Sequence, residues 1–215
     1  ASLDGHIAAS SGDSRWIAGP EAREWAHHLR TRVDAILVGS DTVLVDDPRL
    51  TARPNGDESE RQLLRVVLDS RGRTPLSAQV LTGPAKTLIV TTEASSQEWR
   101  KEIQGVGGDL LLLPSDGEHL DLSALLTSLG ERSILSLLVE GGGVVLGAFF
   151  DRRLVDKLHA VIAPIVVGAM DAPMAISGKG AYRMADALRL RGITMKKLGE
   201  DMLISGYPVY AEIKD

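Results

Sequence analysis

Short apolar runs recur through the middle of the chain at intervals that predict alternating strands and helices. The runs are rich in Val, Ile and Leu, which is typical of strands buried inside a parallel sheet, and they lie at residues 34–39, 64–69, 86–91, 109–113 and 134–139. Stretches of helical composition at residues 96–104 and 120–129 separate the later ones. This spacing predicts parallel β-α-β units.

The two ends of the chain have a different pattern. Pro20 followed by Glu21 predicts a helix over residues 20–30, because proline is favoured in the first turn of a helix. Beyond residue 150, strands are predicted at residues 155–163, 189–197, 202–206 and 207–213, and the last three are close enough to pair antiparallel. We therefore predict an α/β fold in one domain, with a mostly parallel sheet flanked by helices and an antiparallel C-terminal strand pair.

A glycine turn lies at the centre of the pattern. The apolar run at residues 134–139 has the composition of a strand buried on both faces, and it ends at Glu140; three glycines follow, and then an apolar stretch at residues 144–150 that can form a helix. Free amides at such a helix start can hold a phosphate, but small residues there also allow close packing. The pattern matches neither G-x-G-x-x-G nor the P-loop, so both interpretations stay open.

Composition excludes several classes of function. The chain has 215 residues, 44% of them hydrophobic, and a net charge of −5, which argues against nucleic acid or an acidic membrane surface as the main partner. It has no cysteine, so disulfides, thiolate catalysis and cysteine-bound zinc are excluded, and a cytoplasmic location is expected. His27 and His28 lack the spacing of a metal pair, no run is long enough to cross a membrane, and no G-x-S-x-G motif occurs. We expect no metal site.

Four polar residues stand at the ends of predicted elements: Ser14, Arg30, Arg53 and Ser70. Arginine offers a fork of donors that suits phosphate, and serine offers a single hydroxyl. Each is also a common surface residue, so the residues alone do not decide between a phosphate site and a solvated surface.

Seven segments together resemble one family. They are ASLDG (1–5), DSRWI (13–17), DAILVG (34–39), TVLVDDPRLT (42–51), VLDS (67–70), LVEGGG (138–143) and IAP (162–164). In this order, and over nearly the whole chain, they are similar to the reductase half of the bacterial riboflavin biosynthesis deaminase/reductase.

The resemblance implies a dihydrofolate-reductase-like fold, with residues 1–215 as one reductase domain. It also implies an NADPH-dependent reduction of the ribosyl group of 5-amino-6-(5-phosphoribosylamino)uracil, a phosphorylated pyrimidine, to the ribitylamino product. Carried over by position, the cofactor would contact Trp16, Thr42, Asp46, Ser70, Gly142, Gly143, Val144, Val145, Leu146, Gly147 and Ala148. The substrate would contact Ser14, Arg30, Leu50, Arg53 and Glu140.

The reaction also requires a proton, and we expect Glu140 or Asp4 to supply or relay it. For Glu140 the alternative is that it only hydrogen-bonds ribose hydroxyls. Two other functions stay open: a related reductase of this fold acting on another pyrimidine or pteridine, and a nucleotide-binding module without turnover.

Two parts of the family pattern are missing from these 215 residues. The chain opens with what reads as the end of a strand, so the family's first strand, with its lysine, is expected to lie upstream of Ala1. The zinc deaminase half, which needs H-x-E and P-C-x-x-C, is absent, and whether a deaminase domain precedes the chain in nature stays open. We expect a homodimer, because the C-terminal strands offer edges that family members cover at a subunit interface.

Overall fold

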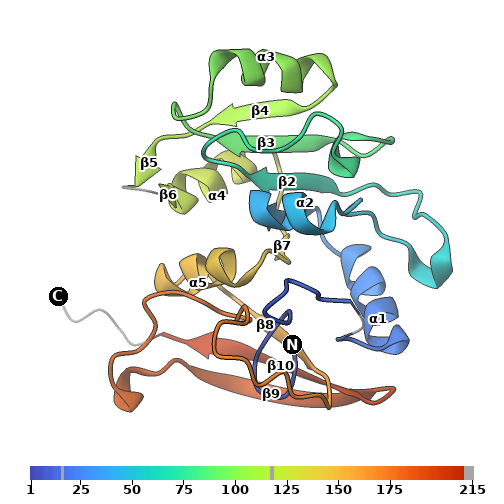
Figure 1. The fold of residues 1–215 in the computed structure, drawn as a ribbon, viewed down its shortest axis with the longest axis vertical. Helices are drawn as coiled ribbons and strands as arrows, with labels where there is room; N and C mark the ends of the chain where they lie inside the picture. The colour runs from blue at the N-terminus through green and yellow to red at the C-terminus, as the bar shows by residue number, and fades with distance from the viewer. Residues whose placement is uncertain (16, 117–118, 211–215) are drawn as a thin grey trace. The chain divides into compact units, whose positions relative to one another are not determined.

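The structure is a computed structural model that describes residues 1–15, 17–116 and 119–210. Its contacts divide the chain into two compact units (Figure 1). One unit is Ala26–Gly141, and the other combines Ala1–Trp25 with Gly142–Asp215. The division falls inside helix α1 (Pro20–Arg30), which has the bounds predicted from the sequence.

The unit Ala26–Gly141 is built on a five-stranded sheet in the order β4-β3-β2-β1-β7. All four pairings are parallel. The strands are β1 (Ala35–Gly39), β2 (Leu64–Leu68), β3 (Thr87–Thr91), β4 (Asp109–Leu112) and β7 (Leu137–Val139). The chain therefore runs outward from β1 to β4 and then returns to the other side of β1 at β7.

Helices and short turns connect these strands. They are α2 (Ser40–Asp46), α3 (Gln97–Gly105), α4 (Leu122–Glu131), and the 3-10 turns η1 (Pro54–Gly56) and η2 (Gln79–Leu81). The Ser96 and Asp121 side chains cap α3 and α4 by accepting hydrogen bonds from main-chain N–H groups of the first turn. A two-stranded ladder of β5 (Ser115–Asp116) and β6 (His119–Leu120), which the sequence pattern did not predict, lies between β4 and α4.

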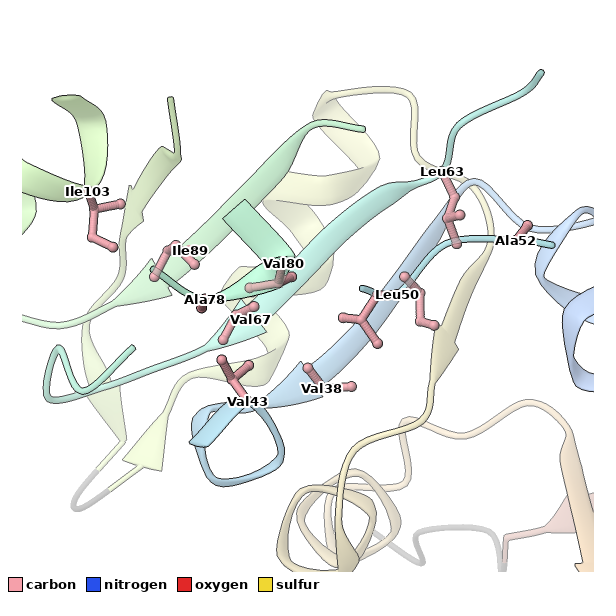
Figure 2. Close-up of a cluster of buried hydrophobic side chains, with 11 residues drawn as sticks. Val38, Val43, Leu50, Ala52, Leu63, Val67, Ala78, Val80, Ile89 and Ile103 are labelled. Carbon is pink, nitrogen blue, oxygen red and sulfur yellow. The ribbon is translucent and has the colours of Figure 1, made fainter. Parts of the chain in front are cut away.

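One hydrophobic cluster holds the strands, α2 and α3 of this unit together. Its eleven members come from β1, β2, β3, α2, α3, η2 and the loops before and after β2, and Figure 2 shows them as sticks. They are Ile36, Val38, Val43, Leu50, Ala52, Leu63, Val67, Ala78, Val80, Ile89 and Ile103. The alternation of strands and helices predicted from the sequence is confirmed here.

The strand predicted at residues 134–139 is shorter and less buried than expected. Only Leu137–Val139 forms β7, which is an edge strand of this sheet, and its residues are partly exposed. Leu135 is 88% exposed. The carboxylate of Asp34 accepts hydrogen bonds from the main-chain N–H groups of Leu135 and Ser136, at 3.1 and 3.0 Å. These bonds hold the approach to β7 outside the strand ladder, so burial on both faces was a wrong prediction.

The unit of Ala1–Trp25 and Gly142–Asp215 contains α5 (Gly143–Asp151), the 3-10 turn η3 (Met184–Asp186) and an antiparallel sheet in the order β8-β10-β9. Its strands are β8 (Leu158–Ile162), β9 (Arg189–Leu198) and β10 (Asp201–Val209). The strands predicted at residues 202–206 and 207–213 are one strand as far as Val209, with a register shift between Ser205 and Tyr207. Residues 211–213 of this prediction lie outside the described residues. The antiparallel C-terminal pair is confirmed, and it forms a sheet separate from the parallel one.

No helix in the described ranges combines the length and the apolar composition needed to cross a membrane.

Candidate active site

The carboxyl ends of the parallel strands gather polar residues at one edge of the five-stranded sheet. Ser40 follows β1, Asp69 and Ser70 follow β2, Thr92 follows β3, and Glu140 follows β7. The order of the strands reverses at β1, because β2, β3 and β4 are added on one side of it and β7 on the other. Open parallel sheets bind ligands outside the carboxyl ends of the strands at such a reversal. Glu140 therefore stands where a ligand site is expected.

Arg30 and Glu140, which the resemblance assigned separately to the substrate, form one ion pair. Arg30 Nε donates to Glu140 Oε1 at 2.9 Å, and Arg30 Nη2 donates to Glu140 Oε2 at 2.6 Å. The two side chains are only 16% and 26% exposed. Burial alone would lower the pKa of Arg30, but the hydrogen bonds and the charge of Glu140 outweigh it, and the pKa is raised. This forked geometry fixes both groups in position.

The same guanidinium reaches the loop that follows α2. Arg30 Nη1 donates to the carbonyl of Thr51 at 3.0 Å. Three donors of Arg30 are thus taken by Glu140 and Thr51, which leaves it few for a substrate phosphate. Arg53, two residues along this loop, has a guanidinium without a hydrogen bond or ion pair to any described residue, while its main-chain N–H donates to His27 Nδ1 at 3.2 Å.

Two other contacts of this loop bear on the site. The Glu58 carboxylate lies 3.8 Å from the guanidinium of Arg49 and not beside Arg53. Leu50 is 4% exposed, and its side chain belongs to the hydrophobic cluster of Figure 2. The predicted contact of Leu50 with substrate can therefore involve only its main-chain atoms.

The loop after β2 is shaped by Asp69, which sequence reasoning did not single out. Its fully buried carboxylate accepts hydrogen bonds from the main-chain N–H groups of Arg73 and Thr74 and from the Thr74 hydroxyl. Arg73 in turn donates to Ser40 at 2.7 Å and pairs with Asp41 at 2.8 Å, both at the start of α2. An aspartate at a strand end, with a glycine three residues later at Gly72, was the available signal for such a turn.

Two of the predicted cofactor residues lie on α2: Thr42 is in its first turn and Asp46 is its last residue. A third, Ser70, lines a separate cavity. This cavity has a volume of about 350 Å³ and lies at the carboxyl ends of β2, β3 and β4. Its lining includes Ser70, Arg71 and Thr92. The Ser70 hydroxyl and the Arg71 guanidinium have no hydrogen-bond partner among the described residues, whereas the Thr92 hydroxyl donates to the Ser70 carbonyl at 2.8 Å.

The remaining predicted residues belong to the unit of Ala1–Trp25 and Gly142–Asp215. Ser14 lines a cavity of about 760 Å³ with Ile7, Arg15, Arg23 and others of that unit. Trp16 lies outside the described residues.

Asp4, also in this unit, is held as a carboxylate. The hydroxyl of Ser2 donates to it at 2.6 Å and the N–H groups of Val167 and Gly168 at 3.2 and 2.7 Å; these bonds, led by that of Ser2, hold the pKa of Asp4 far below its usual range against a smaller opposing effect of desolvation. A group with so low a pKa is ill suited to donate a proton near neutral pH.

The glycines of α5 are tightly packed. A Cβ on Gly143 would lie 2.2 Å from the carbonyl oxygen of Met174, and a Cβ on Gly147 would lie 1.6 Å from that of Ser177. The packing interpretation is therefore confirmed for these two residues. Gly142 forms the N-cap of α5 without a side-chain hydrogen bond. The predicted cofactor contacts from Gly142 to Ala148, Val144, Val145 and Leu146 included, stay a prediction.

No group of three or more His, Cys, Asp or Glu side chains in the described ranges is arranged to hold a metal ion.

Known proteins with similar sequences or structures agree with this fold. An archaeal 2,5-diamino-6-ribosylamino-4(3H)-pyrimidinone 5′-phosphate reductase, from Methanothermobacter thermautotrophicus, is 37% identical over 202 residues, which cover 94% of this chain and 92% of the relative. The structure of Acinetobacter baumannii RibD superimposes with a TM-score of 0.82 and 31% identity, over 97% of this chain and 56% of that one.

A third similar protein carries two activities in its name. The structure is that of a Thermotoga maritima diaminohydroxyphosphoribosylaminopyrimidine deaminase/5-amino-6-(5-phosphoribosylamino)uracil reductase, with a TM-score of 0.76 and 27% identity, over 97% of this chain and 54% of that one. The chain spans about half the length of the curated RibD proteins that it matches.

The dihydrofolate-reductase-like fold expected from the sequence is confirmed by these similarities. The family model of the RibD C-terminal domain matches residues 1–204. With this match over nearly the whole sequence, and with a relative of known class similar over almost its full length, the chain belongs to the RibD C-terminal domain family.

Proposed function

We propose that this chain reduces the ribosyl group of 5-amino-6-(5-phosphoribosylamino)uracil to the ribitylamino product of riboflavin biosynthesis, with NADPH as the reductant. The similarity to the archaeal reductase carries the proposal, because it extends over nearly the full length of both chains. The ion pair of Arg30 and Glu140 beside the reversal point of the sheet supports it, since it gives the site a fixed acceptor and a fixed positive charge.

A second substrate has a specific observation in its favour. The archaeal relative is named for the diamino pyrimidinone phosphate, which still carries the amino group that a deaminase would remove. We therefore propose the deaminated uracil compound first and the diamino compound as the alternative. Oxidation of NADPH, followed at 340 nm with each purified pyrimidine, decides between them; binding of NADPH with turnover of neither would indicate the nucleotide-binding module instead.

The residues of this chain mainly have to place the reactants, because hydride transfer depends on orientation and on exclusion of water. When bound, the nicotinamide cofactor supplies the hydride. Glu140, fixed by Arg30, would accept a hydrogen bond from a substrate hydroxyl or relay a proton, and the free guanidinium of Arg53 would bind the substrate phosphate with two parallel donors. The low pKa of Asp4 disfavours the donor role predicted for it, so Glu140 is the remaining candidate.

The cavity at the ends of β2, β3 and β4 fits the phosphate that distinguishes NADPH from NADH. Ser70 and Arg71 line it with unpaired donors, and a guanidinium is the group best suited to a phosphate monoester. Glu93 also lines the cavity, but its carboxylate is paired with Arg100 at 3.1 Å. We therefore propose that Arg71 contacts the 2′-phosphate of the cofactor, with Ser70 beside it.

Replacing Arg71 with glutamine should reduce kcat/KM for NADPH by about thirtyfold, the loss of one charge-assisted contact of roughly 2 kcal/mol. The efficiency with NADH should not change, because NADH lacks the phosphate. Arg132→Gln is the matched control: Arg132 is exposed and lies before β7, away from the cavity lining. Equal losses with both cofactors would remove Arg71 from this role.

The homodimer stays a prediction, which the antiparallel sheet supports. β9 is an edge strand of that sheet, all but two of its ten residues are exposed, and exposed apolar side chains include Ile193 and Met195. Long exposed edges invite association. We expect a dimer mass by light scattering at micromolar concentration, and a monomer would count against the proposal.

Two proposals concern context rather than chemistry. The Thermotoga maritima relative is named as a deaminase as well as a reductase, so a deaminase is a natural partner of this reaction, either fused upstream or separate. We also place the reaction in the cytoplasm, where NADPH is supplied.

A further inference from the structure

Arg65 is a buried charge whose hydrogen bonds to the described residues all go to main-chain carbonyls. It lies in the middle of the sheet, on β2, and is 2% exposed. Its guanidinium donates to three main-chain carbonyls, those of Arg49 at 3.3 Å, Thr82 at 2.9 Å and Ala85. No carboxylate among the described residues is hydrogen-bonded to it. A buried ion is expensive unless it is paired, and apolar side chains of similar size usually serve stability as well.

The loop on one side of Arg65 holds an unfavourable backbone conformation. Leu50 has a φ angle of 51°, although it is not glycine. Asp47, with a φ angle of 40°, is the left-handed C-cap of α2, a conformation that aspartate tolerates. A leucine in this region persists only where surrounding contacts over-determine it, and such residues gather at ligand sites. The loop around Leu50 therefore needs support from other segments.

Four donors from four different segments supply that support. The Gln79 amide group donates to the Asp47 carbonyl at 2.9 Å, and Ser59 donates through its main-chain N–H to the carbonyl of Ala52 at 2.9 Å. Between them, Arg65 holds the carbonyl of Arg49 and Arg30 holds that of Thr51. The buried guanidinium of Arg65 and the partly buried one of Arg30 thus fix carbonyls two residues apart, on either side of the strained Leu50.

The loop connects to both parts of the substrate site. It ends at Arg53, whose guanidinium is unpaired, and its Thr51 carbonyl accepts from the same Arg30 that holds Glu140. We propose that Arg65 is a positioning residue for the substrate: it holds residues 47–53 in the strained conformation that presents Arg53 and supports the pair of Arg30 and Glu140. This inference rests on the proposed function for the substrate side of the site.

A purely structural role is the competing explanation. Two of the three carbonyls, those of Thr82 and Ala85, belong to the connection between β2 and β3, so Arg65 could serve only to pin that connection. The two roles predict different effects on binding when the hydrogen-bond donors of Arg65 are removed. Release of residues 47–53 affects the substrate and leaves the nicotinamide cofactor alone, whereas a loosened sheet affects both.

The test uses Arg65→Met, which keeps most of the volume and removes every donor. We expect KM for the pyrimidine phosphate to rise on the order of tenfold, because small misplacements of binding groups have effects of at least this size, while KM for NADPH does not change. Amide hydrogen exchange, measured by mass spectrometry, should speed up in peptides that cover residues 47–53. Gln79→Ala removes the side-chain bonds to Asp47 and keeps the main-chain N–H bond to Asp47 Oδ1, so it should shift both readouts in the same direction by a smaller amount.

Thr87→Val is the matched control. It removes a buried hydrogen bond of 2.5 Å from the Thr87 hydroxyl to the Val80 carbonyl, in the same connection, and no described hydrogen bond joins Thr87 to residues 47–53. It should lower stability while both KM values and the exchange of the loop stay as in the parent. A parent enzyme that turns over neither pyrimidine would refute the proposed function. The exchange measurement would still test whether Arg65 holds residues 47–53.

Three results would overturn the inference. Unchanged exchange at residues 47–53 in Arg65→Met would mean that Arg65 does not hold the loop. Faster exchange with an unchanged KM for the pyrimidine would mean that the loop does not position the substrate. Equal rises of both KM values in Arg65→Met and in Thr87→Val would assign the effect to general loosening of the sheet.

Discussion

Replacing Gly147 with alanine is expected to destabilise the protein severely, by roughly 3 kcal/mol or more, because overpacking at a rigid contact forces the backbone to move. The added Cβ would lie 1.6 Å from the carbonyl oxygen of Ser177 and 2.3 Å from its carbon. Both atoms belong to main chain, which cannot turn aside as a flexible side chain would. Urea unfolding followed by circular dichroism measures the change.

Gly130→Ala provides the comparison within another helix. Gly130 lies near the end of α4, and an added Cβ there would meet nothing within 4 Å. Alanine at an open helical position should raise stability by about 0.5 to 1 kcal/mol, because it restricts the unfolded chain. If the two variants were equally stable, the close approach of α5 to residues 174–178 would be refuted.

The glycine turn shows what the sequence could and could not predict. Three glycines after a strand indicated either a phosphate cradle or close packing, and the residues alone did not separate these. The atoms that Gly143 and Gly147 touch lie some thirty residues further along the chain, at Met174 and Ser177, in a segment without regular periodicity. A pattern that depends on local spacing cannot identify such a partner.

Local signals predicted a helix well where the signal lies in the first turn or at the N-cap of that helix. Pro20 with Glu21 marked the start of α1, and Ser96 and Asp121 stand at the N-caps of α3 and α4. The run at residues 134–139 was misleading because its apolar composition resembles that of a central strand. Its first half lies outside β7, where the main-chain N–H groups of Leu135 and Ser136 donate to the Asp34 carboxylate. Leu50 was assigned to the substrate by resemblance, and only the packing reveals its place in the hydrophobic cluster.

The candidate site was predicted as a set of residues but not as an arrangement. Arg30 and Glu140 are 110 positions apart, and no spacing rule indicates that they form a forked ion pair. The pairing depends on β7 returning beside β1, which is a property of the whole sheet. Arg65 went unnoticed for a similar reason: a single arginine inside an apolar run looks like a surface position until the sheet is assembled.

The pairing changes what is expected of the two residues in catalysis. If Arg30 bound the substrate phosphate and Glu140 acted elsewhere, their substitutions would have independent effects on kcat/KM, and the losses would multiply. If they act as one unit, the double variant should be little worse than the poorer single one, as for groups that depend on each other.

We expect the second behaviour. Glu140→Gln puts an amide donor against a guanidinium donor, because both carboxylate oxygens accept from Arg30, and kcat/KM should fall by about a hundredfold. Arg30→Met removes the fork and the bond to Thr51, and its loss should be of similar size. Steady-state kinetics of the two single variants and the double variant, with thermal unfolding as a check on folding, complete the cycle.

The way in which the loss divides between kcat and KM decides the role of Glu140 that the sequence left open. A residue that donates or relays a proton acts only in the transition state, so its loss lowers kcat with little change in KM. A residue that only holds ribose hydroxyls contributes to ground-state binding as well, so its loss raises KM and leaves kcat nearly intact. Independent, multiplying losses in the double variant would show that the ion pair is not the functional unit, and Arg30 would return to the separate substrate contact expected from the resemblance.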